Sequence, residues 1–259
     1  MRIARVAHAQ GMSFGVVSGE GAGTTVAEIE GHPFGTITTT GQRWALEDVR
    51  LMAPILPSKV VCVGRNYAAH AAERGAEVPT EPLLFLKPST SVIGPGDPIR
   101  LPPQSEEVDH EAELAIVIGV GGARRVTDRA QAEAAIFGYT CANDITARDL
   151  QRSDNQWTRA KGFDSFCPLG PWIETDLDVT DVEVRCEVND SVRQLGRTKD
   201  MIFTPATIVS YISHIMTLLP GDVILTGTPE GIEPLAPNDS VSVSVEGIGT
   251  LTNPVVSLD

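Results

Sequence analysis

The sequence predicts a mixed, mainly β fold with a few helices, preceded by a small β domain at the N-terminus. Residues 2–8, 13–18 and 24–30 are short strand-like runs separated by glycine-containing turns. Strand-like runs recur further along, whereas only the stretch that begins at Thr204 carries a long helical stripe of apolar residues. Two prolines make 52–58 a linker, so we expect an N-terminal domain and linker over 1–57 and a main domain over 58–259.

Composition excludes several classes of protein. The formal net charge of −14 argues against nucleic acid and anionic membranes as partners. No apolar run is long enough to span a membrane and no signal-peptide core is visible, so we expect a cytoplasmic protein. The four cysteines have no C-x-x-C spacing and predict buried free thiols: Cys62, Cys141, Cys167 and Cys186.

A candidate acid–base pair follows the first strand of the main domain. Residues 59–64 (KVVCVG) predict a buried strand, and Asn66 is placed to cap a helix over 67–74. His70 and Glu73 are three residues apart on that helix and share one face. A carboxylate beside an imidazole makes a general base, although a plain surface pair gives the same spacing. Residues 75–82 could let this helix move as a lid.

The stretch 108–118 places two carboxylates on one side of a predicted strand. Glu111 and Glu113 are two residues apart and would lie roughly 7 Å from each other at their Cα atoms. Paired carboxylates repel unless a cation lies between them, and Glu oxygens suit hard divalent ions. The alternative is that Asp109, Glu111 and Glu113 form the solvated face of an edge strand.

The next elements supply further polar candidates. Residues 83–86 predict a strand that ends at Lys87, a site residue or an ordinary surface lysine. A helix over 127–136 starts near Asp128, and a strand over 137–145 ends in Asp144, a natural third carboxylate. Thr146 could cap a helix over 146–151 that carries Arg148 and Gln151 on one face, and a long loop over 157–168 presents Lys161.

The last third predicts a hairpin, one strong helix and a polar turn. Asn189 and Asp190 join strands over 181–188 and 192–195. The helix begins at Thr204-Pro205, and its apolar stripe predicts core: Ile208, Val209, Ile212, Ile215, Met216 and Leu219. His214 lies off that stripe and is expected at the surface. After a strand over 223–226, Thr228 lies in a tight turn that could hold a carboxylate or be only a turn, and strands over 241–246 and 249–252 follow.

Six motifs together resemble the fumarylacetoacetate hydrolase superfamily over residues 58–255, and they occur in that family's order. They are VGRNYAAH (63–70), FLKPST (85–90), HEAEL (110–114), NDITARD (143–149), KGFD (161–164) and LTGTPEG (225–231). The resemblance implies the family's mixed β-roll with the active site at its open end, preceded by the small β unit that occurs in bacterial members. It also implies a homodimer.

The resemblance further implies a role for each candidate residue. Glu111, Glu113 and Asp144 fall on the family's metal ligands, usually for one Mg²⁺ or Mn²⁺ ion per chain. His70 and Glu73 fall on the acid–base pair of a mobile helix, and Lys161 on the lysine that faces the substrate. The remaining four match substrate-binding positions: Arg148, Gln151 and Thr228 at the substrate's oxygens, and Arg65 at the base of the lid.

These residues predict an enzyme that acts on small anionic 2-oxo or 1,3-dicarbonyl carboxylic acids through a metal-stabilised enolate. Acylpyruvate-type carbon–carbon hydrolysis and oxaloacetate-type decarboxylation are the first expectations. Isomerisation or decarboxylation of 2-hydroxyhepta-2,4-diene-1,7-dioate (5-carboxymethyl-2-hydroxymuconate) is the alternative, since the motifs do not separate these reactions. Outside catalysis, the chain could be a silent binder of metal and 2-oxo acids.

Overall fold

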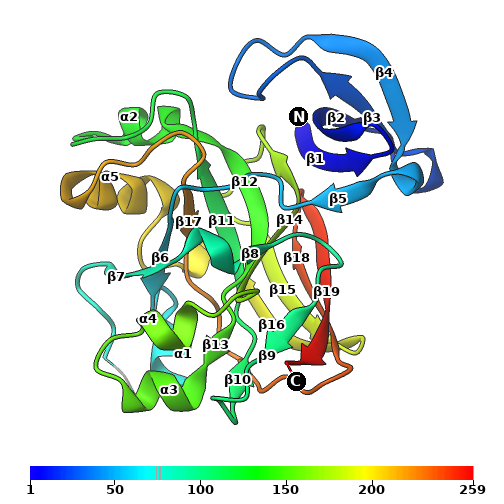
Figure 1. Cartoon of the computed structure of the whole chain (residues 1–259). Helices are drawn as coiled ribbons and strands as arrows, with labels where there is room; N and C mark the ends of the chain where they lie inside the picture. The colour runs from blue at the N-terminus through cyan, green and yellow to red at the C-terminus, as the bar shows by residue number, and fades with distance from the viewer. Residues whose placement is uncertain (74, 76, 259) are drawn as a thin grey trace.

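The computed structural model describes residues 1–73, 75 and 77–258, and it is mainly β with a few helices, as the sequence predicts (Figure 1). Within these residues, the largest sheet runs in the order β4-β3-β2-β1-β14-β12-β11-β17-β6-β7, with β5 beside β1 and β8 beside β14. Its strands are β1 (Arg2–His8), β2 (Gly11–Ser18), β3 (Thr25–Ile29), β4 (Thr39–Ala45), β5 (Arg50–Met52), β6 (Val60–Gly64), β7 (Leu83–Lys87), β8 (Val92–Ile93), β11 (Ala112–Ile118), β12 (Ile136–Asn143), β14 (Cys167–Glu174) and β17 (Val223–Leu225).

A second sheet and several short helices complete the part of the chain that the structure describes. The second sheet has the order β16 (Ser191–Arg197), β15 (Glu183–Val188), β18 (Ser240–Val245), β19 (Gly249–Ser257), β9 (Ile99–Leu101), and β10 (Val108–Asp109) pairs with β13 (Thr146–Ala147). The helices are α1 (Ala68–Glu73), α2 (Arg129–Ala134), α3 (Arg148–Ser153), α4 (Thr158–Lys161) and α5 (Pro205–Ile215). None of these described helices has the length and apolar character needed to cross a bilayer.

The N-terminal strands lie at one corner of the molecule, far from α1, α3 and α4 (Figure 1). They continue the large sheet, because β1 pairs with β14 at Arg2↔Glu174 and Ile3↔Ile173. The strands β1, β2 and β3 were predicted, but β4 and β5 were not, since β4 is polar and largely exposed and shows no apolar alternation. Met52, assigned above to the linker, is the last residue of β5. The domain boundary at residue 57 stays a prediction.

Strand β11 is the centre of the core, and all seven of its residues are buried. Leu114 packs with residues of the second sheet, such as Val184 and Val243, in one apolar cluster. Ile116 and Ile118 pack against Ile208 and Ile212 of α5 in a second cluster. Ala115 and Val117 point to the other side of the sheet, as alternation along a strand requires, and contribute to a third.

Several local predictions are confirmed. Asp128 caps α2 by accepting from the Gln131 N–H, and Thr204 accepts from the Thr207 N–H with Pro205 at the first position of α5. Asn189 and Asp190 both have positive φ (50° and 62°), as a two-residue hairpin turn requires. His214 is exposed, and Cys62, Cys141, Cys167 and Cys186 are buried free thiols.

Other local predictions are wrong. The expected strand over 108–118 breaks at His110, whose N–H bonds to the Glu233 carbonyl, and restarts as β11. The residue before α3 is Ala147, so Thr146 is no helix cap and lies in β13. The expected loop over 157–168 contains α4 and the start of β14. The predicted apolar stripe is core only in part, since Ile215 at the end of α5 and Leu219 beyond this helix are about half exposed.

Asn66 was predicted to cap α1, but its side chain joins two other segments. Its amide nitrogen donates to the carbonyls of Thr226 and Phe203, and its amide oxygen accepts from the Phe203 N–H. These bonds fix the end of β6 against the turn that follows β17. The predicted end of the helix at Arg74 and part of the proposed lid segment, Ala76, lie outside the described residues.

Candidate active site

Three carboxylates meet beside the central strand. Antiparallel pairing of β11 with β12 sets Ala112 opposite Asn143, which brings Asp144 next to Glu111 and Glu113. The Asp144 N–H also donates to the Glu111 carbonyl at 2.8 Å. One carboxylate oxygen from each residue lies within 4.8 Å of the other two, and the three residues are at most 5% exposed. The alternative of a solvated edge is therefore wrong for these residues.

Two buried lysines approach the carboxylates. Lys161 Nζ lies 2.9 Å from Glu111 Oε2 and 2.6 Å from Asp144 Oδ2. Lys87 Nζ lies 2.5 Å from the other oxygen of Asp144 and 3.1 Å from the Ile145 carbonyl. The sequence left Lys87 open between a site residue and a surface lysine, and its exposure of 1% rules out the second. Asp144 is thus fixed by a cation at each oxygen.

Arg148 holds Glu111 from the opposite side. Its guanidinium nitrogens donate to Glu111 Oε1 at 2.6 Å, to Asp109 Oδ2 at 2.8 Å and to Gln151 Oε1 at 2.6 Å. Burial lowers the pKa of Arg148, but the charges of Glu111 and Asp109 outweigh burial and raise it. Arg148 is therefore a fixed cation that orients a carboxylate. Its contact with substrate, and that of Gln151, stay predictions.

The protein's own cations do not neutralise the three carboxylates equally. Burial raises the pKa of Glu111, but the charges of Lys161 and Arg148 outweigh it and hold that pKa well below its usual range. For Glu113, burial and the charges of Asp144 and Glu111 all raise the pKa well above its usual range. The Glu113 Oε2 atom accepts from the Gly227 N–H at 2.5 Å, a weaker compensation than a full charge.

The donor set fits a divalent cation. Among the described residues around this cluster, four buried carboxylates (Asp109, Glu111, Glu113 and Asp144) face three buried cations (Lys87, Lys161 and Arg148). The unbalanced carboxylate is Glu113, beside the other two ligand candidates. Buried like charges at this spacing favour a hard cation with oxygen ligands. The triad could hold one such ion.

His70 and Glu73 form the predicted pair on α1. His70 Nδ1 lies 3.1 Å from Glu73 Oε2, and His70 is buried while lining the same cavity as the carboxylates. The second oxygen of Glu73 accepts from the Gly231 N–H at 2.9 Å. The turn 227–231 thus touches both the acid–base pair and Glu113. A side chain at Gly227 (φ +99°) would lie 2.6 Å from the Asn66 Cβ, so only glycine fits there.

The Thr228 hydroxyl already has two protein partners. It donates to the Ala112 carbonyl at 2.9 Å and accepts from Gln194 Nε2 at 2.8 Å. Gln194 also donates to the Pro229 carbonyl and accepts from the Ala112 N–H, which fixes the orientation of its amide. His110 Nδ1 lies 3.0 Å from Gln194 Oε1 and must therefore donate to it. Gln194 was not among the predicted residues, since a lone glutamine in a strand carries no recognisable signal.

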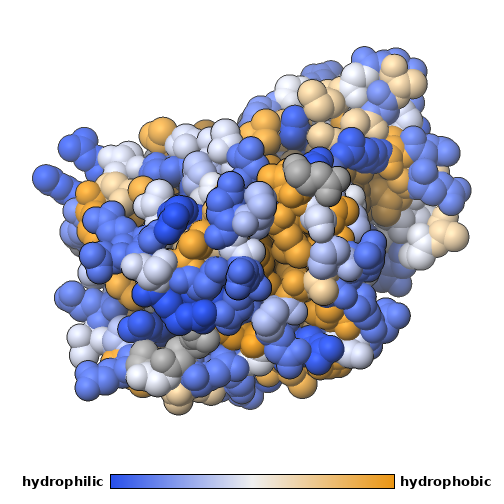
Figure 2. All heavy atoms as spheres, turned by 60° about the horizontal axis from the view of Figure 1, so that its bottom comes forward, coloured by the Kyte–Doolittle hydropathy of each residue, from blue (hydrophilic) through white to orange (hydrophobic). Residues whose placement is uncertain are grey.

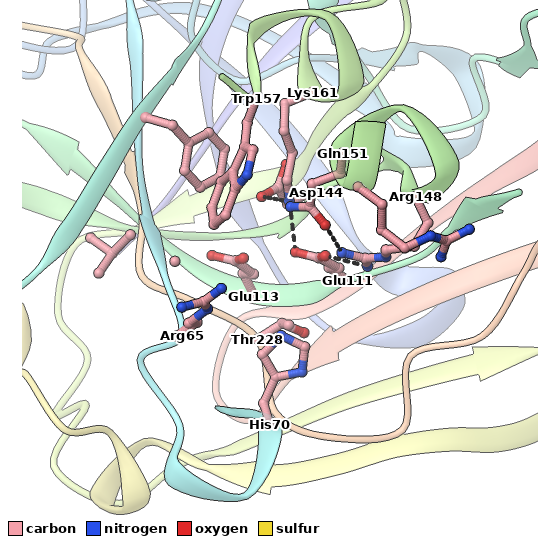
Figure 3. Close-up of a pocket in the computed structure, with 14 residues that line it drawn as sticks. Arg65, His70, Glu111, Glu113, Asp144, Arg148, Gln151, Trp157, Lys161 and Thr228 are labelled. Atoms are coloured by element: carbon pink, nitrogen blue, oxygen red, sulfur yellow. Dashed lines mark hydrogen bonds and ion pairs between the residues drawn. The ribbon is translucent and has the colours of Figure 1, made fainter. Parts of the chain in front are cut away.

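The candidate residues surround one cavity of about 330 Å³ (Figure 3). Nine of the ten predicted site residues line it, and the tenth, Glu73, reaches it through His70. In Figure 3, Lys161 and Asp144 lie on one side of Glu111 and Glu113, and His70 and Thr228 lie on the other. The sequence analysis missed further lining residues: Val63, Gly64, Phe85, Arg152 and Trp157. The structure brings the predicted residues together, and their chemical roles stay predictions.

Arg65 differs from the other cations of the cavity. It has a positive φ of 60°, and its guanidinium lies 6.0 Å from the centre of the Trp157 ring. Within the described part of the chain, no carboxylate lies within ion-pair distance of Arg65. A cation without a carboxylate partner in the protein can bind an anionic group of a ligand.

Comparison with known proteins agrees with this geometry. Residues 59–256 match the family model described as fumarylacetoacetate (FAA) hydrolase C-terminal. The chain belongs to the fumarylacetoacetate hydrolase superfamily. Residues 1–54 match a second family model, described as Rv2993c-like, N-terminal. The superfamily resemblance stated from six motifs is thereby confirmed.

Several relatives cover most or all of the chain. Protein Rv2993c of Mycobacterium tuberculosis is 56% identical over 99% of this chain and 98% of its own length. A crystal structure of a 5-carboxymethyl-2-hydroxymuconate delta-isomerase from Mycobacterium smegmatis is 55% identical, covers 100% of both chains and has a TM-score of 0.94. The mitochondrial oxaloacetate tautomerase FAHD2A of Homo sapiens is 44% identical over 81% of this chain and 70% of its own length. These similarities fit the fumarylacetoacetate hydrolase fold described above.

Proposed function

We propose that this chain is a metal-dependent enzyme that acts on 2-oxo or 1,3-dicarbonyl carboxylic acids through their enolate. The observation that carries the proposal is the buried triad of Glu111, Glu113 and Asp144 at the wall of a cavity that also holds Lys161 and His70. A metal ion bound by three carboxylates keeps coordination positions open for a substrate. Carboxylate oxygens are hard ligands, which favour one Mg²⁺ or Mn²⁺ ion. A cation bound there would polarise the keto oxygen of the substrate and lower the energy of the enolate.

The chain's own residues can bind and protonate such a substrate. Lys161 holds a buried positive charge beside Glu111 and Asp144, where the substrate's oxygens would lie, so it can stabilise negative charge that develops on them. His70, oriented by Glu73, can accept or return a proton from the other side of the cavity. Arg65 can bind a second carboxylate of a dicarboxylic substrate.

Proton transfer is the outcome that we propose first. Two of the relatives named above are called a delta-isomerase and an oxaloacetate tautomerase, and both names describe the movement of a proton on a 2-oxo acid or its enol. Abstraction and return of one proton needs one base with access to the carbon atom, which His70 supplies. The proposed activity is tautomerisation or isomerisation of a 2-oxo dicarboxylic acid.

Hydrolysis of an acylpyruvate is the second candidate. The same pair could activate water against a second carbonyl, because Glu73 orients the His70 ring through Nδ1 and leaves Nε2 available. Decarboxylation of oxaloacetate would need the triad and Lys161 but no base. Proton transfer and hydrolysis therefore both need His70, whereas decarboxylation does not.

The experiment is a substrate panel with the purified chain. Oxaloacetate, an acylpyruvate and 5-carboxymethyl-2-hydroxymuconate are incubated with Mg²⁺, Mn²⁺ or EDTA. Enol absorbance and exchange of the C3 protons with deuterium are then followed. We expect metal-dependent exchange of oxaloacetate protons. Binding of metal and acid without any turnover would contradict an enzymatic function and support a silent binder.

We also propose a homodimer. Figure 2 shows hydrophobic residues gathered in a band across one face of the molecule, between hydrophilic ones. Such a band is the kind of surface that a second copy of a chain covers. Light scattering should give the mass of two chains at micromolar concentration. A monomer mass would contradict this proposal without affecting the proposed activity.

A further inference from the structure

Trp157 separates the candidate active cavity from a second, apolar cavity. The second cavity has a volume of about 520 Å³, and Trp157 and Phe85 line both. The rest of its wall is largely aliphatic and includes Val61, Leu84, Leu86 and Met216. The active cavity, by contrast, is lined largely by charged groups. One aromatic partition therefore divides a charged compartment from an apolar compartment.

The indole of Trp157 is held on more than one side. It meets the Phe85 ring edge to face, with 5.3 Å between ring centres and 69° between planes. A Cβ atom at Gly64 would lie only 3.0 Å from Trp157 Cζ3, so this glycine lets the ring lie against β6. The Arg65 guanidinium lies over the ring as well. A side chain packed in this way is a fixed wall and not a loose surface group.

We infer that Trp157 is a specificity-determining residue that limits the length of the substrate. With the indole present, a 2-oxo acid bound to a cation that the carboxylate triad would hold meets a wall at the side of Phe85 and Trp157. A smaller side chain would join the two cavities and admit 2-oxo acids with an apolar tail, which would lie against Leu84, Leu86 and Met216. This inference rests on the proposed function.

Trp157 can be changed without removing the backbone contact that positions Lys161. The Lys161 N–H donates to the Trp157 carbonyl at 3.0 Å, and any residue at 157 supplies that carbonyl. A purely structural role for the indole predicts equal losses for short and long substrates. A specificity role predicts a change in their ratio.

The experiment compares oxaloacetate with 2-oxooctanoate in the Mn²⁺-loaded protein and in its Trp157→Leu and Trp157→Ala variants. The two readouts are the rate of C3 proton exchange and the dissociation constant from calorimetry. We expect the long-to-short ratio of exchange rates to rise, and the long-to-short ratio of dissociation constants to fall, each by roughly 10-fold or more, the scale of hydrophobic-pocket discrimination. Trp157→Leu keeps most of the packing and serves if the alanine variant does not fold.

Leu86 supplies matched controls, because it lines the second cavity and not the first. Leu86→Ser alone should leave the preference between the long and the short acid unchanged. Leu86→Asp combined with Trp157→Ala should remove the preference for the long acid that Trp157→Ala creates. Equal losses for both acids, or a gain that survives Leu86→Asp, would overturn the inference. Absence of exchange with oxaloacetate in the wild type would instead contradict the proposed function, while the calorimetric ratio would still test Trp157.

Discussion

Lys161 Nζ lies 2.6 Å from Asp144 Oδ2, and the two residues are 2% and 1% exposed. The same ammonium also bonds to Glu111, so it contacts two of the three carboxylates that could hold a metal ion. Burial lowers the pKa of Lys161, but the charges of Asp144 and Glu111 outweigh burial and raise it. The lysine is therefore charged, and it shares its two partners with the candidate ion.

Replacing this lysine should make the fold depend on metal. Lys161→Met leaves Asp144 paired with Lys87 alone and Glu111 paired with Arg148 alone, and breaking a buried ion pair costs about 3–5 kcal/mol of the free energy of unfolding. Mn²⁺ should recover more stability in this variant than it adds to the wild type, while turnover is lost. Urea unfolding with and without Mn²⁺ measures both effects. Lys59→Met is the control, because Lys59 pairs with Asp222 outside the triad, and an altered metal response there would contradict this reasoning.

Glu113→Gln should abolish metal binding and preserve the fold. Burial and the charges of Asp144 and Glu111 raise the pKa of Glu113, so its ionised form is unfavourable without a cation. The neutral variant should therefore be at least as stable as the metal-free wild type. At a metal concentration 100 times the dissociation constant, the wild type should gain about 2.7 kcal/mol and the variant almost nothing. Thermal unfolding with Mg²⁺ or Mn²⁺ checks this, and a full response in Glu113→Gln would show that the ion lies elsewhere.

The buried thiols should not react with thiol reagents until the protein unfolds. Burial raises the pKa of Cys141 and Cys186 to about 12, against about 8.5 for an exposed cysteine. A thiol reagent at pH 8 should therefore label neither residue in the native protein. The thiols stay protonated to a higher pH in the folded state than in the unfolded state. The stability that they contribute is therefore present below about pH 8.5 and is lost as pH rises towards about 12. Mass spectrometry after labelling, with and without urea, tests this, and rapid native labelling of either residue would contradict it.

Sequence alone predicted the members of the site better than their contacts. Glu111, Glu113 and Asp144 were expected as ligands because motifs keep residue types in order along the chain. The pairing of β11 with β12, which brings Asp144 to the other two, is a long-range event that no local pattern encodes. The break at His110 involves an equally distant segment, because the His110 N–H bonds to the Glu233 carbonyl there. Chain order therefore predicted the candidate ligands, whose metal-binding role stays a prediction, and strand pairing determines their geometry.

The residues that the sequence did not assign to the site share a physical reason. Lys87, Gln194 and Trp157 act through neighbours that are distant in sequence: Lys87 through Asp144, Gln194 through Thr228 and Trp157 through Phe85. A lysine after an apolar strand looks the same whether it is solvated or buried. In the same way, Ile215 was expected in the core but is exposed. Helical periodicity does not show at which residue α5 stops contacting the rest of the protein.

The acid–base pair on α1 can separate decarboxylation from the other two candidate reactions. Hydrolysis requires an activated water and tautomerisation requires removal of a carbon-bound proton, and His70 with Glu73 is the base that the cavity offers for both. Decarboxylation of oxaloacetate requires no base, because the departing carboxylate leaves its electrons behind. His70→Ala should therefore lower hydrolysis or proton exchange by roughly 10²-fold or more and decarboxylation by much less. Rates of enol loss, deuterium exchange and carbon dioxide release in the same preparation measure all three.

Glu73→Gln refines this test, because the amide keeps a contact with His70 but cannot stabilise a charged imidazolium. We expect it to lose less activity than His70→Ala and to show the same order of sensitivity among the reactions. Lys161→Met should harm all three, since each passes negative charge to the oxygens that this lysine faces. If all three activities fall equally in His70→Ala while the Mn²⁺-induced stabilisation is unchanged, the histidine closes the cavity and does not transfer the proton.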